Sequence, residues 1–267
     1  MPPRLTDSSA LKIHRNRASE TFLHVEVADE VQERLTEVNR RFTDPVVITP
    51  FPQVWGNFGK VIDDEEILNI SPASHDLAIH VLALHWANDP VGQMVQCRRA
   101  LRPDGLFMAF LFGGQTLWEL RACLAQAETN VTGGLSPRVL PMGEIRDLGG
   151  LLQRAGFSLP VADSFTKTVR YRDAFHLMHD IRAMGEGNAL ADRLRRPTRR
   201  DVFVEAAKLY NDQFADSEGR IPATFEIICL TGWAPDPSQQ QPLRPGSAKQ
   251  RLADVLKSFD PPTDSTK

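Results

Sequence analysis

Two apolar runs, residues 76–84 and 106–112, constrain the fold of this 267-residue chain most strongly. Both are nearly continuous rather than alternating, which is typical of strands buried on both faces of a parallel sheet. Between them, Asp89 followed by Pro90 is typical of the cap and first residue of a helix. A strand, a helix and a second strand in this order predict a parallel βαβ unit. We therefore expect an α/β fold.

The other elements extend this unit on both sides. The short spacing between residues 46 and 76 leaves room for one compact crossover, whereas a complete doubly wound sheet would need three. Thr116 and Glu119 match a capping box at a helix start. We expect a truncated, mostly parallel sheet that ends in an antiparallel strand, with added late helices. Apolar patterns predict strands at 46–49, 164–171 and 224–233, with the last two paired, and helices at 21–42, 117–124, 145–155, 175–184 and 201–214.

Three segments differ in composition. Residues 1–20 are polar and we expect them to be poorly ordered. Residues 21–234 carry the apolar patterns and form the predicted folded domain. Residues 235–267 are rich in proline, glutamine and serine, which predicts a mostly disordered tail.

Composition excludes several classes of protein. The net charge of −3 gives no global field that would attract nucleic acid or a membrane surface. No apolar run approaches the roughly 20 residues of a membrane span, and residues 1–20 lack the apolar core of a secretion signal. The three cysteines, at 97, 123 and 229, have no metal-binding spacing. We therefore expect reduced, buried thiols, a cytoplasmic location and no metal site.

Several long motifs resemble one enzyme superfamily. Residues 76–89 and 101–107 are similar to class I S-adenosylmethionine-dependent methyltransferases. Residues 112–121, 147–149, 184–188 and 221–227 resemble more closely the branch that contains respiratory complex I assembly factors and the malonyl-carrier methyltransferases of the biotin pathway. The resemblance covers roughly residues 42–48 and 60–233. It implies a Rossmann-like fold, S-adenosylmethionine as cofactor, and a protein partner such as a complex I subunit. Members of the assembly-factor branch are linked to modification of an arginine in such a subunit.

The resemblance also implies positions for cofactor contacts. Asp63 or Asp64 matches the acidic position that contacts the adenine, after the family's third strand. The segment Leu84, His85 and Trp86 matches the one that lines the methionine end of the cofactor. It assigns no catalytic residue. From the residues alone, His85 is either functional or a hydrogen-bonded cap of the strand end, and the acidic run 63–66 is either a solvated loop or a metal site.

The segment after the first strand departs from this family. Members carry a Gly-x-Gly loop there, whereas the first glycine of this chain is Gly56. Pro50 and Pro52 remove backbone donors from the segment, and Phe51 and Trp55 add bulk where glycine would let a ligand approach. If several hydrogen bonds of ~1 kcal/mol each are lost, affinity falls by orders of magnitude. We therefore expect absent or very weak S-adenosylmethionine binding.

Three functions follow from these observations. The first is a methyltransferase-family protein that acts on or chaperones a protein partner in complex I assembly, with impaired cofactor binding. The second is an active S-adenosylmethionine-dependent methyltransferase with an atypical site. The third is a scaffold without a small ligand. An arginine-rich segment, residues 193–200, is either a solvated loop or a docking site for an acidic protein surface.

Overall fold

The computed structural model describes residues 4–56 and 58–240, and within them six strands form one sheet in the order β2-β1-β3-β4-β6-β5. The pairs β1–β2, β1–β3 and β3–β4 are parallel, whereas β6 runs antiparallel to both β4 and β5. The predicted α/β fold with a mostly parallel sheet and an antiparallel end is therefore confirmed. The strands are β1 Pro45–Ile48, β2 Lys60–Ile62, β3 His75–Val81, β4 Leu101–Phe112, β5 Ser158–Tyr171 and β6 Ile221–Trp233.

The shortened crossover lies between β1 and β3. The connection from β1 to β2 contains only a single 3-10 turn, η1 (Pro52–Val54), and β2 returns to β3 without a helix in the described chain. β2 is three residues long and still pairs in parallel with β1. The sheet therefore keeps its central strands and lacks long helical crossovers on the β1 side.

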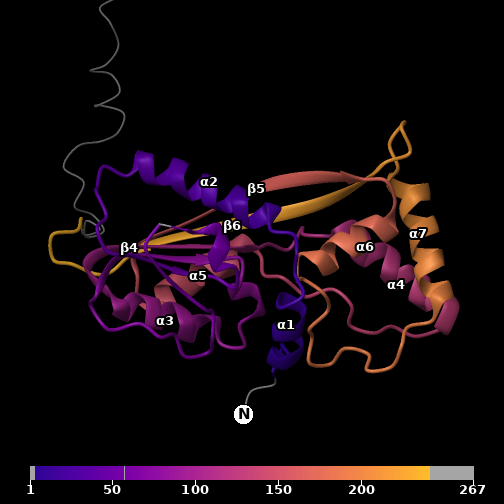
Figure 1. The fold of residues 1–267 in the computed structure, drawn as a ribbon, viewed down its shortest axis with the longest axis horizontal. Helices are drawn as coiled ribbons and strands as arrows, with labels where there is room; N and C mark the ends of the chain where they lie inside the picture. The colour runs from indigo at the N-terminus through magenta and orange to yellow at the C-terminus, as the bar shows by residue number, and fades with distance from the viewer. Residues whose placement is uncertain (1–3, 57, 241–267) are drawn as a thin grey trace, which may run out of the picture. The chain divides into compact units, whose positions relative to one another are not determined.

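Helices cover both faces of the sheet (Figure 1). On one face, α2 (Phe22–Glu37), α4 (Trp118–Thr132), α6 (Ala174–Ala183) and α7 (Arg200–Phe214) contribute to one apolar cluster. On the other face, α3 (Pro90–Ala100) and α5 (Ile145–Ala155) contribute to a second. Successive residues of β1 alternate between the two clusters, as expected for a strand covered on both sides.

The predicted start of α3 is confirmed in atomic detail. The side chain of Asp89 accepts a hydrogen bond of 2.8 Å from the backbone N–H of Gly92, and Pro90 occupies the first turn. Local sequence therefore determines this boundary.

The predicted capping box of α4 is wrong. Leu117, in the left-handed region with a φ of 53°, is the cap residue, and it makes no side-chain cap bond. Thr116 Oγ1 instead donates to the carbonyl of Glu226 at 3.0 Å, and Glu119 binds the Thr224 hydroxyl. Both box residues bind β6 because that strand lies beside the start of α4 and offers partners that a local pattern does not reveal.

The prediction that residues 1–20 are poorly ordered is wrong for α1 (Ser8–Arg15). The Asp7 side chain caps this helix through the N–H of Ala10, and Leu11 is buried. Asp7 also pairs with Arg193 and Arg195 at 2.9 and 3.0 Å. These partners lie far along the chain, so composition alone missed them. Most of the predicted tail, residues 241–267, lies outside the described residues.

The three cysteines are buried and free, as predicted. Burial raises the pKa of Cys97 and of Cys229 to about 12, and that of Cys123 to about 11. Because the thiolate is the reactive form, these thiols are chemically inert at neutral pH.

Candidate functional site

The candidate site lies at the carboxyl ends of the parallel strands, where open α/β sheets bind ligands. β1 ends at Ile48, β2 at Ile62 and β3 at Val81, so the segments that follow them meet at one edge of the sheet. A hydrogen bond of 3.0 Å from the N–H of Thr49 to the carbonyl of Ile62 ties two of these ends together.

Two aromatic side chains of the segment after β1 are buried. Phe51 and Trp55 each expose only 4% of their surface. The Phe51 ring packs edge-on against His24 of α2, with centroids 4.6 Å apart, and Trp55 packs against Phe58. The rings of Phe51 and Trp55 are therefore buried in the protein, and the Phe51 ring contacts α2.

Arg15 of α1 binds Asp64, an acidic residue that follows β2. Its Nη1 donates to both carboxylate oxygens of Asp64, at 2.7 and 2.9 Å. The side chains are 10% and 13% exposed, so the pair is largely withdrawn from water. Asp63, its neighbour, is exposed and makes no such contact among the described residues.

Glu186 holds the segment after β3. Its Oε2 accepts a hydrogen bond of 2.6 Å from Trp86 Nε1 and lies 3.3 Å from His85 Nε2. Burial alone would raise the pKa of Glu186, but the hydrogen bonds with His85 and Trp86 and the positive charge of Arg15 hold it below its usual range. Glu186 is therefore an anion that fixes both rings. The His85 ring is therefore hydrogen-bonded within the fold through its Nε2.

Around Arg15 and Glu186, several buried polar atoms have no hydrogen-bond partner among the described residues. Burial lowers the pKa of one of these groups, His24, to about 4, so its ring is neutral at pH 7. A buried polar group without a partner costs about 1–3 kcal/mol. A cavity of about 10 Å³ beside His24 and Glu186 has room for about one water molecule. The unpartnered atoms are Arg15 Nε and Nη2, His24 Nδ1, His85 Nδ1 and Glu186 Oε1.

The five residues predicted to bind the cofactor do not share one surface. Leu84 is 2% exposed and packs in the apolar cluster beneath α3. Trp86 belongs to a different cluster, which includes Leu11 of α1. Asp64 and His85 lie at the candidate site, but each is engaged by another side chain of the protein.

Sequence reasoning missed Arg15 and His24, which lie at this site. Arg15 lies in a segment that we expected to be poorly ordered, and His24 resembles any polar residue on an amphipathic helix. Glu186 was singled out only as part of the motif 184–188. No local signal identifies Arg15 or His24, because their partners are distant in sequence.

A larger cleft of about 600 Å³ adjoins the site. Its walls come from α1, α4, α6 and α7, together with residues 184, 186, 187 and 188 of the motif named above. Trp86 and Glu186 line both the cleft and the candidate site. Most of the remaining lining is apolar.

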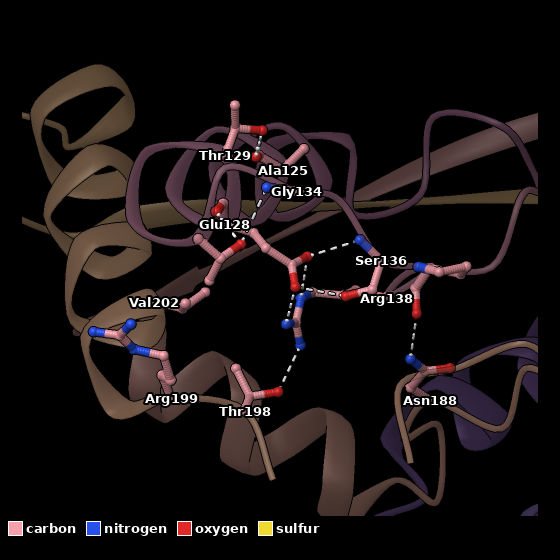
Figure 2. Close-up of polar contacts among 12 residues, drawn as sticks. Ala125, Glu128, Thr129, Gly134, Ser136, Arg138, Asn188, Thr198, Arg199 and Val202 are labelled. Atoms are coloured by element: carbon pink, nitrogen blue, oxygen red, sulfur yellow. Dashed lines mark hydrogen bonds and ion pairs between the residues drawn. The ribbon is translucent and has the colours of Figure 1, made fainter. Parts of the chain in front are cut away.

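Figure 2 shows a second buried ion pair, which joins Arg138 of the cleft lining to Glu128. Arg138 donates from Nε and Nη2 to the two carboxylate oxygens of Glu128, at 2.9 and 2.6 Å, and from Nη1 to the hydroxyl of Thr198 at 2.9 Å. Ser136 also donates to Glu128. The hydrogen bonds from Arg138 hold the pKa of Glu128 at about 2. The pair joins α4, the loop after it and the arginine-rich segment.

Comparison with known proteins identifies relatives of this chain. No protein-family model matches the sequence. Over 193 residues, 72% of this chain and 44% of the relative, it is 42% identical to "Arginine-hydroxylase NDUFAF5, mitochondrial" of Dictyostelium discoideum. Over 181 residues, 68% of this chain and 59% of the relative, it is 33% identical to "Malonyl-[acyl-carrier protein] O-methyltransferase" of Xylella fastidiosa (strain M23). The chain is a homologue of NDUFAF5 and of these methyltransferases.

The chain spans only about half the length of these relatives. Among solved structures, it aligns with the YcgJ protein of Bacillus subtilis with a TM-score of 0.49 and 12% identity, over 78% of this chain and 99% of that one. The name of the NDUFAF5 relative assigns that protein to mitochondria, whereas the sequence led us to expect a cytoplasmic location here.

Within residues 4–56 and 58–240, none of the helices combines the length and the apolar character needed to span a membrane. No group of three or more histidine, cysteine or acidic side chains there is placed to hold a metal ion.

Proposed function

We propose that this homologue of NDUFAF5 acts in the assembly of respiratory complex I by binding a protein partner, with little or no use of S-adenosylmethionine. The assembly role rests on the resemblance of residues 112–121, 184–188 and 221–227 to complex I assembly factors and on the identity to NDUFAF5. The reduced role of the cofactor rests on the side chains at the strand ends. The observation that carries it is the position of Arg15 on Asp64.

The residues at the strand ends fit an adenosyl ligand poorly. Asp64, one of the two candidates for the adenine contact, already accepts two hydrogen bonds from Arg15, whereas Asp63, the other candidate, is exposed. Pro50 and Pro52 lack backbone donors, and the buried ring of Phe51 takes the volume in which a glycine loop would admit a ligand.

The alternative is an active methyltransferase with an atypical site, in which Asp63, Asp64, His85 and Trp86 lie near S-adenosylmethionine. One observation favours it. The unpartnered atoms of His85 and Glu186 remain available to a polar ligand at the same edge. If such a ligand bound, they would gain the partners that they now lack.

Calorimetric titration of the full chain with S-adenosylmethionine tests the cofactor statement. We expect no saturable heat up to ~1 mM, which corresponds to a binding free energy weaker than about −4 kcal/mol. A micromolar dissociation constant together with methyl transfer to a protein would refute it.

Complementation tests the assembly role separately. In cells that lack this protein, the wild-type chain should restore assembled complex I on native gels. The variant D63A should restore it within about twofold if the cofactor is unnecessary. Under the alternative, it should lower complex I at least ~10-fold, about 1.4 kcal/mol in the reaction it supports. If the wild-type chain restores no complex I, the assembly role itself is wrong.

A further inference from the structure

The cleft beside the candidate site combines an apolar interior with a positively charged rim. Its volume of about 600 Å³ lies within the range of small-molecule sites. Its interior contains aromatic and aliphatic side chains, among them Phe112, Leu117, Leu120 and Phe225, each at most 8% exposed. These surfaces would accept an apolar group of matching size.

Two arginines on the rim have no partner among the described residues. Arg17 and Arg182 line the cleft and are exposed, and neither makes an ion pair or side-chain hydrogen bond within residues 4–56 and 58–240. By contrast, the third arginine of the lining, Arg138, is bound to Glu128. The rim therefore has two uncompensated positive charges.

No free negative charge balances them in the lining. Glu186 is the acidic residue of the lining, and its Oε2 is engaged by Trp86 and His85. The other titratable side chains of the lining are histidines: His14, which is hydrogen-bonded to the carbonyl of Gly187 at 3.1 Å, and His179, which is exposed. An anion would be attracted to this rim and a cation repelled.

We propose that the cleft binds an anionic amphiphile, that is, an apolar chain or ring with one carboxylate or phosphate head. The apolar body would lie against Phe112, Leu120 and Phe225, and the head would face Arg17 and Arg182. This site goes beyond the proposed function and does not depend on it. An amphiphile would occupy the cleft whether or not the protein binds S-adenosylmethionine or acts in complex I assembly.

Methionine methyl groups report on this site directly. Met142, Met178 and Met184 line the cleft, whereas Met94 and Met108 are buried in the sheet clusters and do not line it. In a sample labelled with ¹³C at the methionine methyl groups, sub-micellar dodecanoate should shift the first three signals and leave the other two unchanged. Dodecyl phosphate, tested in parallel, distinguishes a phosphate head from a carboxylate head.

A ligand of opposite charge and arginine variants of the protein test the proposal further. Dodecylammonium has the same chain and the opposite charge, and should bind at least ~10-fold more weakly than dodecanoate. The double variant R17A/R182A should weaken dodecanoate binding about five- to tenfold, since exposed charge pairs contribute up to about 1 kcal/mol each. R196A, an exposed arginine outside the cleft, is the matched control and should leave binding unchanged.

Several outcomes would overturn the proposal. They are equal affinity for dodecanoate and dodecylammonium, shifts at Met94 and Met108 only, and no binding of either anion. Binding of an acidic peptide with no response to the two dodecyl anions would likewise overturn it and assign the cleft to a protein ligand. A third variant, M178E, places a negative charge on the lining and should abolish binding while α6 stays folded by circular dichroism.

Discussion

The guanidinium of Arg15 donates to both carboxylate oxygens of Asp64, across 49 residues of sequence, with both side chains at least 87% buried. This contact attaches α1 to the end of β2. It also places a cation of the protein on Asp64, one of the two carboxylates, Asp63 or Asp64, that the family resemblance matches to the adenine contact. We therefore expect the contact to contribute to stability.

Removal of Arg15 should destabilise the fold. In R15A, Asp64 stays largely buried without its cation, so the free energy of unfolding should fall by about 1–3 kcal/mol. Urea denaturation of R15A, D64A and the double variant forms a double-mutant cycle that isolates the pair. We expect a coupling energy above about 0.5 kcal/mol. Additive effects of the two changes would show that the contact contributes nothing.

The substitution E186Q should weaken the hold on Trp86. Glutamine keeps an acceptor but loses the charge, and hydrogen bonds to charged groups are worth about 1.5–3 kcal/mol against ~1 for neutral ones. The indole N–H resonance of Trp86 should move upfield and exchange faster with solvent. The matched control is E218Q at an exposed position, 72% accessible, which should change neither. An unchanged indole signal in E186Q would argue against the contact with Glu186.

The substitution E128Q should loosen the loop that follows α4. Arg138 would lose its anion, and we expect a cost of about 2 kcal/mol and faster amide exchange over residues 133–141. The pKa of Glu128 in the folded protein, about 2, is below its ordinary value of 4.5. Its stabilisation is therefore present above pH 4.5 and is lost as the pH falls from 4.5 towards 2.

The stability difference between wild type and E128Q should consequently shrink on acidification. Guanidinium denaturation at pH 6 and at pH 3 measures it. D201N, which removes an exposed carboxylate paired with Arg199, is the control and should have a smaller effect at pH 6. A difference that stays constant with pH would contradict the ion pair.

Acidification should also destabilise the protein through His80. Burial lowers its pKa to about 4, and its Nε2 contacts Gln93 Oε1 at 2.9 Å. The unfolded chain therefore binds a proton at higher pH than the folded one, so stability falls as the pH falls from 6.5 to 4. From pH 7 to pH 5 the loss is about 2 kcal/mol for this one group.

The pH slope of stability distinguishes His80 from other groups. In H80N, the free energy of unfolding measured by urea between pH 5 and 7 should depend less on pH than in wild type. His24 keeps part of the dependence, because burial lowers its pKa to about 4 as well. H176N, at an exposed histidine, should leave the slope unchanged. An identical slope in H80N and wild type would mean that His80 does not titrate as a buried group.

The sequence by itself determined the order and type of the elements around the βαβ unit. Continuous apolar runs predicted β3 and β4, and the Asp89 and Pro90 pair fixed the start of α3. These signals are local, since hydrophobic period and cap chemistry act within a few residues. The spacing between residues 46 and 76 likewise predicted the short crossover, because chain length limits what can fit there.

Only the tertiary structure decided what fills the carboxyl edge of the sheet. Asp64 and His85 were named from sequence, but their partners, Arg15 and Glu186, lie 49 and 101 residues away. Similarly, Thr116 and Glu119 bind residues of β6, whereas the predicted capping box would have them bind the backbone at the start of α4. The physical reason is that a polar side chain pairs with whatever the fold brings within about 3 Å of it. That distance depends on how the whole chain packs, and no local pattern specifies it.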